Sequence, residues 1–391
     1  MRTRPIPVIV IAGFLGSGKT TLLNHLLRNR DGVRIGAIVN DFGGIEIDAM
    51  AVAGQVDSMV SLGDGCLCCA VDTEDLDDVL DKLARPSAGI DLIVIEASGL
   101  AEPETLIRML LASRDRRIVY GGLLEVVDAA EFEATRARHP ELDRHLRVAD
   151  LIVLNKTDRV VDERRRALLA EINTLAPGTP AVAAAHGRVD PGLFFDRDGE
   201  AAERDGIRQL TFEDLLRETA EDEHGHEHAH TAYQSVEFVS GEPLNPRRFM
   251  SFLDRRPAGL YRMKGVVRFS GAGGAQRWPV HAVGGFLRFY PEPWGAGEER
   301  LTQLVLIGTG LDAEALREEL AGCVQTGEAG EVDHDESALW GVLRYVDDPE
   351  ADAEADPEAE PETDADSQPH DPEADLGGPY GTGVGPRTPS F

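Results

Sequence analysis

Apolar runs and amphipathic segments alternate along the first 185 residues of the chain. Six apolar runs have the length and continuity of strands that are covered on both faces. They lie at residues 6–12, 33–39, 91–95, 122–127, 151–154 and 180–184. Apolar positions recur at helical spacing in the segments between them, at residues 21–27, 73–83, 103–111, 131–138 and 163–175. Strands that alternate with helices predict a doubly wound, mostly parallel α/β sheet over residues 1–185.

The pattern changes in the second half of the chain. Residues 186–231 are charged and interrupted by Gly and Pro, which predicts a linker. The end of this linker is rich in histidine and contains His224, His226, His228 and His230. Short strand-like segments then occur at 235–239, 266–269, 280–283, 287–290 and 302–307, with helical segments at 246–253 and 312–320. They predict a small α+β domain over residues 232–325. Residues 326–391 are rich in acids, Pro and Gly, and predict a mostly disordered tail.

Composition and charge narrow the class of protein. The net charge of the 391 residues is −31, and residues 347–375 carry fourteen acidic and no basic side chains, so the rest carries −17. An acidic folded part argues against nucleic-acid binding. The first apolar run is too short for a signal peptide, and no run approaches the length of a membrane span. A cytoplasmic protein without a membrane partner is therefore expected.

An eight-residue motif joins the first apolar run to the first helical segment. Residues 13–20 read GFLGSGKT and fit G-x-x-x-x-G-K-[ST] at each fixed position. In this context backbone N–H groups bind phosphate, Lys19 reaches the β- and γ-phosphates, and the Thr20 hydroxyl binds Mg²⁺. The predicted nucleotide-binding residues of this loop are Gly13, Gly16, Ser17, Gly18, Lys19, Thr20 and Thr21. The alternative is an ordinary glycine-rich turn.

A second motif, NKTD, follows the apolar run at 151–154. The Asp158 carboxylate can accept hydrogen bonds from guanine N1–H and the exocyclic amine, a donor pair that adenine lacks. Asn155 would contact N7 of the base, and the stem of Lys156 would lie along its plane. The motif therefore favours GTP over ATP. The alternative is a polar turn in which Asp158 caps a helix.

Two further segments directly follow predicted strands and therefore lie at the same predicted edge of the sheet. In EASG, Glu96 can bind Mg²⁺ and the Gly99 N–H can reach the γ-phosphate, whereas the alternative is an acid that caps the next helix. Residues 40–48, NDFGGIEID, resemble a nucleotide-sensing loop in which Asp41 orients water or binds Mg²⁺. An acidic surface loop is the alternative for this segment.

Three of the four cysteines lie within four positions, Cys66, Cys68 and Cys69. Three thiolates so close together can bind one borderline cation such as Zn²⁺ or Co²⁺, and a fourth ligand would come from Asp41, Glu46, a histidine or an open position. Redox chemistry and buried thiols are the alternatives. The remaining cysteine, Cys323, is expected to be a core thiol.

Together these motifs resemble the CobW-type family of metallochaperone GTPases. GFLGSGKTTLLNHLL, VNDFG, GCLCC, EASGLAEP and NKTD occur in the family's order, and RMKG and LIG in the second domain resemble its carboxyl-terminal module. The resemblance implies that the three cysteines bind the transported ion beside the nucleotide, and that Lys19, Thr20, Asp41 and Glu96 serve phosphate and Mg²⁺. Many relatives carry an acid where this chain has Gly44, so the fourth metal ligand is left open.

The resulting hypothesis is a GTP-hydrolysing P-loop metallochaperone with GTP, Mg²⁺ and Zn²⁺ or Co²⁺ as its ligands. Its nucleotide state would control delivery of the metal to a metal-requiring client protein, and the sequence leaves the oligomeric state open, a homodimer included. The alternatives are a metal-storage protein with incidental GTPase activity and a P-loop ATPase or kinase of cofactor synthesis. The histidine-rich segment would collect metal weakly.

Overall fold

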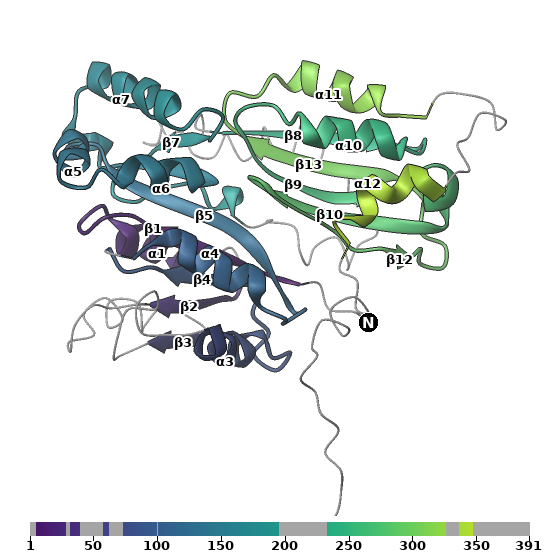
Figure 1. Ribbon diagram of the computed structural model, residues 1–391, viewed down its shortest axis with the longest axis horizontal. Helices are drawn as coiled ribbons and strands as arrows, with labels where there is room; N and C mark the ends of the chain where they lie inside the picture. The colour runs from purple at the N-terminus through teal and green to yellow at the C-terminus, as the bar shows by residue number, and fades with distance from the viewer. Residues whose placement is uncertain are drawn as a thin grey trace, which may run out of the picture. The chain divides into compact units, whose positions relative to one another are not determined.

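The computed structural model describes residues 5–28, 32–39, 58–61, 73–99, 101–194, 233–325 and 336–346. Within these ranges the chain forms two sheets, one parallel and one antiparallel, with helices packed on each (Figure 1). The predicted class, an α/β domain followed by a small α+β domain, is confirmed.

The first sheet has strand order β3-β2-β4-β1-β5-β6-β7 in the described part of the chain, and all neighbouring strands are parallel. Because the strands are parallel, their carboxyl ends lie at one edge, where open α/β sheets bind ligands. The strands are β1 (Ile6–Ala12), β2 (Ile35–Val39), β3 (Ser58–Ser61), β4 (Leu92–Glu96), β5 (Ile118–Asp128), β6 (Leu151–Asn155) and β7 (Ala181–Ala183).

Helices cover both faces of this sheet. The helices are α1 (Lys19–Arg28), α3 (Thr73–Ala84), α4 (Pro103–Ala112), α5 (Phe132–Arg138), α6 (Leu142–Val148) and α7 (Asp162–Leu175), with 3₁₀ turns at Thr157–Arg159 and Pro191–Leu193. The apolar sides of α3 to α7 share one buried cluster with the strands, whereas α1 packs on the opposite face. Four leucines of α1, at i, i+1, i+4 and i+5, make up its buried side.

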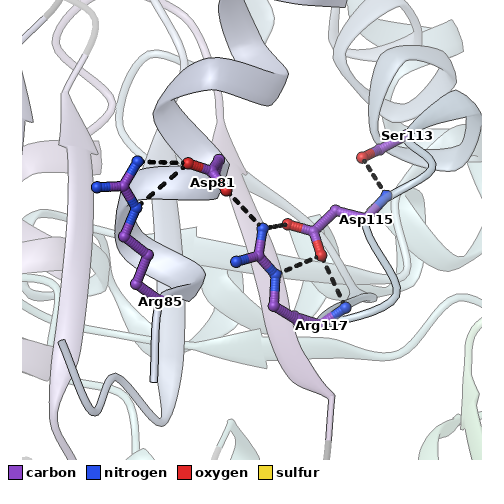
Figure 2. A network of polar contacts seen from close by, with 5 residues as sticks. All are labelled: Asp81, Arg85, Ser113, Asp115 and Arg117. Atoms are coloured by element: carbon purple, nitrogen blue, oxygen red, sulfur yellow. Dashed lines mark hydrogen bonds and ion pairs between the residues drawn. The ribbon is translucent and has the colours of Figure 1, made fainter. Parts of the chain in front are cut away.

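A network of charged residues joins α3 to the start of β5 (Figure 2). The guanidinium of Arg117 lies 2.7 Å from Asp115 and 2.7 Å from Asp81 of α3, and Arg85 contacts Asp81 as well. These hydrogen bonds hold the pKa of Asp81 below its usual value. Since the groups are partly exposed, the network contributes to the placement of α3 more than to stability.

The second sheet is antiparallel, in the order β11-β10-β9-β13-β8, and β12 pairs with β10. Its strands are β8 (Gln234–Ser240), β9 (Leu260–Val267), β10 (Gln276–Val283), β11 (Phe286–Phe289), β12 (Glu292–Pro293) and β13 (Thr302–Gly308). Its helices are α10 (Pro246–Asp254), α11 (Ala313–Gly322) and α12 (Trp340–Leu343), with 3₁₀ turns at Gly271–Ala275 and Glu336–Leu339. Cys323 is buried in this domain's core, as expected from the sequence.

The predicted element boundaries fail where single residues interrupt the apolar pattern. The strand expected at 122–127 begins at Ile118. Gly121 and Gly122 interrupt the apolar run, so its first residues were not recognised as part of the strand. The strand expected at 266–269 is β9, Leu260–Val267, in which Arg262 and Lys264 alternate with the core residues. Neither β3 nor α6 was predicted from the sequence.

Residues 336–346 pack against the second domain, although composition assigned them to the tail. Leu339 and Val342 belong to its buried cluster, and the Phe289 N–H donates to the Tyr345 carbonyl at 2.8 Å. The acidic run that follows Val346 dominates the composition of this region and hides a short apolar segment of the fold. The rest of the predicted tail lies outside the described residues.

Aromatic packing in the second domain gives a stability prediction. Phe269 is fully buried, with ring centroids 5.9 Å from Phe249, 5.7 Å from Trp278 and 6.1 Å from Phe289. Phe269→Ala is expected to lower the free energy of unfolding by about 3–5 kcal/mol, because it removes the transfer free energy of the ring and leaves a cavity. Urea titration followed by circular dichroism measures it. The exposed aromatic Trp340 provides the control, and equal losses in the two variants would contradict the assignment.

Candidate nucleotide site

The phosphate loop connects β1 to α1 and requires glycine at two of its positions. Gly13 has φ 140°, and a Cβ there would lie 2.3 Å from the Val126 carbonyl oxygen. Gly18 has φ 104°, and a Cβ there would lie 2.3 Å from Asn155 Nδ2. The loop closes with a 3.1 Å hydrogen bond from Ser17 N–H to the Phe14 carbonyl. This compact turn leads directly into the first residue of α1, as the motif predicts.

Lys19 is the first residue of α1, and its side chain folds back over the loop. Its ammonium donates to the Gly13 carbonyl at 2.8 Å and to the Phe14 carbonyl at 3.4 Å. The side chain is 8% exposed. A partly buried ammonium at the loop supplies the positive charge that bound phosphates need.

Thr20 and Glu96 meet, although they lie on different elements. The Thr20 hydroxyl donates to Glu96 Oε1 at 2.6 Å, and the Glu96 carboxylate is buried at the end of β4. Hydroxyl and carboxylate oxygens are the donors that Mg²⁺ prefers. These two side chains therefore fit a magnesium ion beside the phosphate loop.

The segment after β4 lies against the phosphate loop. A Cβ on Gly99 would lie 2.8 Å from the backbone nitrogen of Leu15, so only glycine allows this approach. The approach places the Gly99 backbone within reach of a group bound at the loop. Gly16 and Thr21, two further predicted phosphate-loop residues, are exposed.

Asn155 joins three segments that are far apart in sequence. Its side-chain nitrogen donates to the Ser17 carbonyl at 2.9 Å, and its oxygen accepts from Gly187 N–H at 2.9 Å. The side chain is 1% exposed. Asn155 thus holds the phosphate loop to the turn after β7, a role that the sequence analysis, which assigned it a contact to the base, did not foresee.

The other NKTD residues lie nearer the surface. Lys156 has φ 57°, and its ammonium lies 2.8 Å from Asp128 Oδ2 at the end of β5. The Asp158 carboxylate is about one-third exposed and lies 3.7 Å from His186 Nε2. Thr157 fixes the turn through a 2.8 Å hydrogen bond from its hydroxyl to the Ala184 carbonyl. The partly exposed Asp158 carboxylate is accessible to a purine base.

A cavity of about 230 Å³ lies between the start of the phosphate loop and the NKTD turn. Its walls come from the phosphate loop, the end of β5, α5 and the NKTD turn, and include Phe14, Ser17, Asp128, Arg138, Lys156 and Arg159. Lys19, Thr20, Glu96 and Asp158 are not among the residues that line it.

Glu125 was not predicted as a site residue. It lies on β5 beside Ala12, the last residue of β1, and is fully buried. Burial raises the pKa of its carboxyl to about 8, although the positive charge of Lys19 opposes the shift. The only sequence sign of it is a single acid inside the apolar run GGLLEVV.

The comparison with known families agrees with this geometry. The family described as CobW/HypB/UreG, nucleotide-binding domain, matches residues 7–183. The family described as cobalamin synthesis protein cobW C-terminal domain matches residues 233–324. The chain belongs to the CobW family. The first matched region contains the parallel sheet, and the second contains the antiparallel sheet.

One relative supports the membership of the CobW family, and two further matches show similarity to this chain. The zinc chaperone CobW of Sinorhizobium sp is 32% identical over 355 residues, which cover 82% of this chain and 97% of that protein. The zinc chaperone YjiA of Escherichia coli is 33% identical over 201 residues, covering 50% of this chain and 62% of that protein. The crystal structure of Zn(II)-bound YjiA GTPase has 24% identity and a TM-score of 0.39, covering 83% of this chain and 100% of that one.

Several predicted CobW-type site residues lie outside the described residues. They are Asp41, with the rest of residues 40–48, the cysteines Cys66, Cys68 and Cys69, and the four histidines of the linker. Within the described ranges no group of three or more His, Cys, Asp or Glu side chains could bind a metal ion. In the same ranges no helix combines the length and the apolarity that a bilayer span needs.

Proposed function

We propose that the protein is a GTP-hydrolysing metallochaperone that binds Zn²⁺ through Cys66, Cys68 and Cys69 and delivers it to a metal-requiring client protein. The observation that carries the nucleotide part is the 2.6 Å hydrogen bond between Thr20 and Glu96. It joins two motifs that are 76 residues apart at one buried, oxygen-rich point beside Lys19. The metal part is supported by the cysteine spacing and by the zinc chaperones among the relatives.

In this proposal the chain's own residues bind and orient GTP. Backbone N–H groups of the phosphate loop and the Lys19 ammonium bind the β- and γ-phosphates, and Asp158 selects guanine. Thr20 and Glu96 would hold Mg²⁺, which supplies positive charge to the γ-phosphate when bound. Asp41 would orient the attacking water. Hydrolysis then depends mainly on positioning and electrostatic stabilisation.

The proposed coupling between nucleotide and metal depends on residues 40–48. This segment follows β2, whose last residue, Val39, pairs with Glu96 of β4. Because the segment follows Val39 directly in the sequence, we expect it to respond to the γ-phosphate and Mg²⁺. If its ordering moves a ligand onto the thiolates, GTP raises the affinity for Zn²⁺, and linkage requires Zn²⁺ to raise the affinity for GTP by the same factor.

Zinc titration in two nucleotide states tests the proposal. We expect Zn²⁺ to bind at least about fivefold more tightly with a non-hydrolysable GTP analogue than with GDP, the lower end of ordinary allosteric coupling. A competing chromophoric chelator reports the free zinc. Replacing Cys66, Cys68 and Cys69 together by serine should remove the nucleotide-sensitive site. Equal affinities in both states would exclude coupled delivery, and zinc binding that survives the triple replacement would favour storage.

A further inference from the structure

The carboxyl group of Glu125 is unusual among the charged side chains of the described residues. Its exposed fraction is 0%, and neither of its oxygens has a hydrogen-bond partner in the described structure. Strand alternation places it on the same face of β5 as Leu123 and Val127, in the cluster covered by α4 to α7. A buried polar group without a partner costs free energy, so it calls for an explanation beyond packing.

The charged groups around Glu125 come from few elements. From α1, the Lys19 ammonium favours the ionised carboxylate. From α6, His145 Nδ1 lies 4.0 Å from Glu125 Oε1, and burial lowers the pKa of this histidine, which keeps it neutral at pH 7 and above. The other ring nitrogen of His145, Nε2, lies 3.5 Å from the carboxylate of the half-exposed Glu102, which forms an ion pair with Arg144.

The remaining neighbouring acids already have partners. Asp128, three residues further along β5, pairs with Lys156, and Glu96, two strands away on β4, accepts the Thr20 hydroxyl. From α4, α5 and α7, apolar side chains such as Leu106, Phe132 and Leu168 belong to the same buried cluster, and Lys19 is the charged group that shifts the pKa of Glu125. Ionisation of Glu125 therefore changes the electrostatic environment of Lys19.

The phosphate loop packs against the neighbour of Glu125 on α6, His145. The ring of Phe14, a loop residue, stacks on His145 with centroids 5.6 Å apart and on His139 with centroids 4.6 Å apart. Glu125 pairs in the sheet with Ala12, the residue before Gly13, and the Gly13 carbonyl accepts a hydrogen bond from the Lys19 ammonium at 2.8 Å. A change of charge on Glu125 acts directly on the group that binds phosphate.

We propose that Glu125 must be protonated for Lys19 to engage the phosphates of a nucleotide, so that nucleotide binding takes up a proton at this carboxyl. Without nucleotide, Glu125 ionises as the pH rises through about 8 and then balances the charge of Lys19. With nucleotide, the phosphates supply that balance, and a second negative charge at low dielectric repels them. Glu125 acts through Lys19 and is a positioning residue. The inference rests on the nucleotide-binding part of the proposed function and on no metal.

The direction of the pH effect follows from the charge of the two forms. A carboxyl with a raised pKa, here about 8, is neutral at pH 7 and ionises as the pH rises through that value. Nucleotide binding is therefore intact at pH 7 and weakens above pH 8. For one proton taken up, linkage predicts a dissociation constant about tenfold higher at pH 9 than at pH 7.

The test measures GDP binding to the full-length, zinc-free chain by calorimetry between pH 6.5 and 9. The wild type and two variants are compared, Glu125→Gln and, as a matched control, Glu163→Gln, an exposed acid in the first turn of α7. We expect a rise of about tenfold from pH 7 to pH 9 for the wild type and the control, and less than about twofold for Glu125→Gln. Each chain is compared with its own value at pH 7. Cysteine ionisation in this range is common to all three chains and cannot produce the difference.

A second measurement needs no variant. Calorimetry of the wild type at pH 8 in buffers of different ionisation enthalpy should show uptake of about half a proton per nucleotide bound. No uptake, or equal pH profiles for the wild type and Glu125→Gln, would reduce Glu125 to a structural residue. Failure of the wild type to bind GDP at pH 7 would instead overturn the proposed function.

Discussion

Lys19→Ala is expected to lower kcat/KM for GTP by about 10²–10³-fold, comparable to the loss of one preorganised donor at a reacting centre. The Lys19 ammonium lies at the phosphate loop, 2.8 Å from the Gly13 carbonyl, and is largely withdrawn from water. Its interaction with a developing charge on the γ-phosphate is therefore stronger than that of an exposed lysine. Alanine keeps the helical start of α1 but supplies no positive charge.

Phosphate release under single-turnover and steady-state conditions measures this loss. Lys82, an exposed lysine in the last turn of α3, provides a matched control, because Lys82→Ala removes the same charge away from the loop. Circular dichroism establishes that both variants are folded. GTP turnover of Lys19→Ala within twofold of the wild type would mean that Lys19 does not contact the reacting phosphate.

The phosphate loop and the parallel sheet were predictable because local sequence determines them. The loop needs glycine where a Cβ would collide with Val126 or Asn155, and the motif places glycine at both positions, Gly13 and Gly18. The strands read as continuous apolar runs because they are covered on both faces. Where a run is interrupted, as at Gly121 in β5, the predicted strand begins several residues later than the observed one.

Other features depend on contacts between distant segments, which a pattern does not reveal. The role of Asn155 follows from hydrogen bonds to Ser17 and Gly187, 138 and 32 residues away. Glu125 is one acid in an apolar run, and only the packing of the folded chain shows that its carboxyl is buried without a hydrogen-bond partner. The packing of residues 336–346 likewise requires the second sheet. Asp41 and the three cysteines stay predictions of the sequence alone.

Asp158→Asn is expected to change the base preference of the site from guanine to xanthine. A carboxylate accepts hydrogen bonds from guanine N1–H and from the exocyclic amine. An asparagine in its place offers one acceptor and one donor, so the amine of guanine meets a second donor. Each hydrogen bond to a charged group contributes about 1.5–3 kcal/mol, so the loss of one of the two should lower the affinity for GTP by about 10- to 150-fold.

Xanthosine triphosphate carries a carbonyl where GTP carries the amine, and it should bind the Asp158→Asn chain in preference to GTP. Competition between the two nucleotides for a fluorescent analogue measures the exchange in one titration. Asp162→Asn, an exposed acid at the start of α7, serves as the control and should keep the GTP preference. An Asp158→Asn chain that still prefers GTP would place the base elsewhere, and a wild type that binds ATP equally well would favour a cofactor-synthesis ATPase. Because the exchange depends on the donor and acceptor pattern of a single side chain, a general loss of folding cannot imitate it.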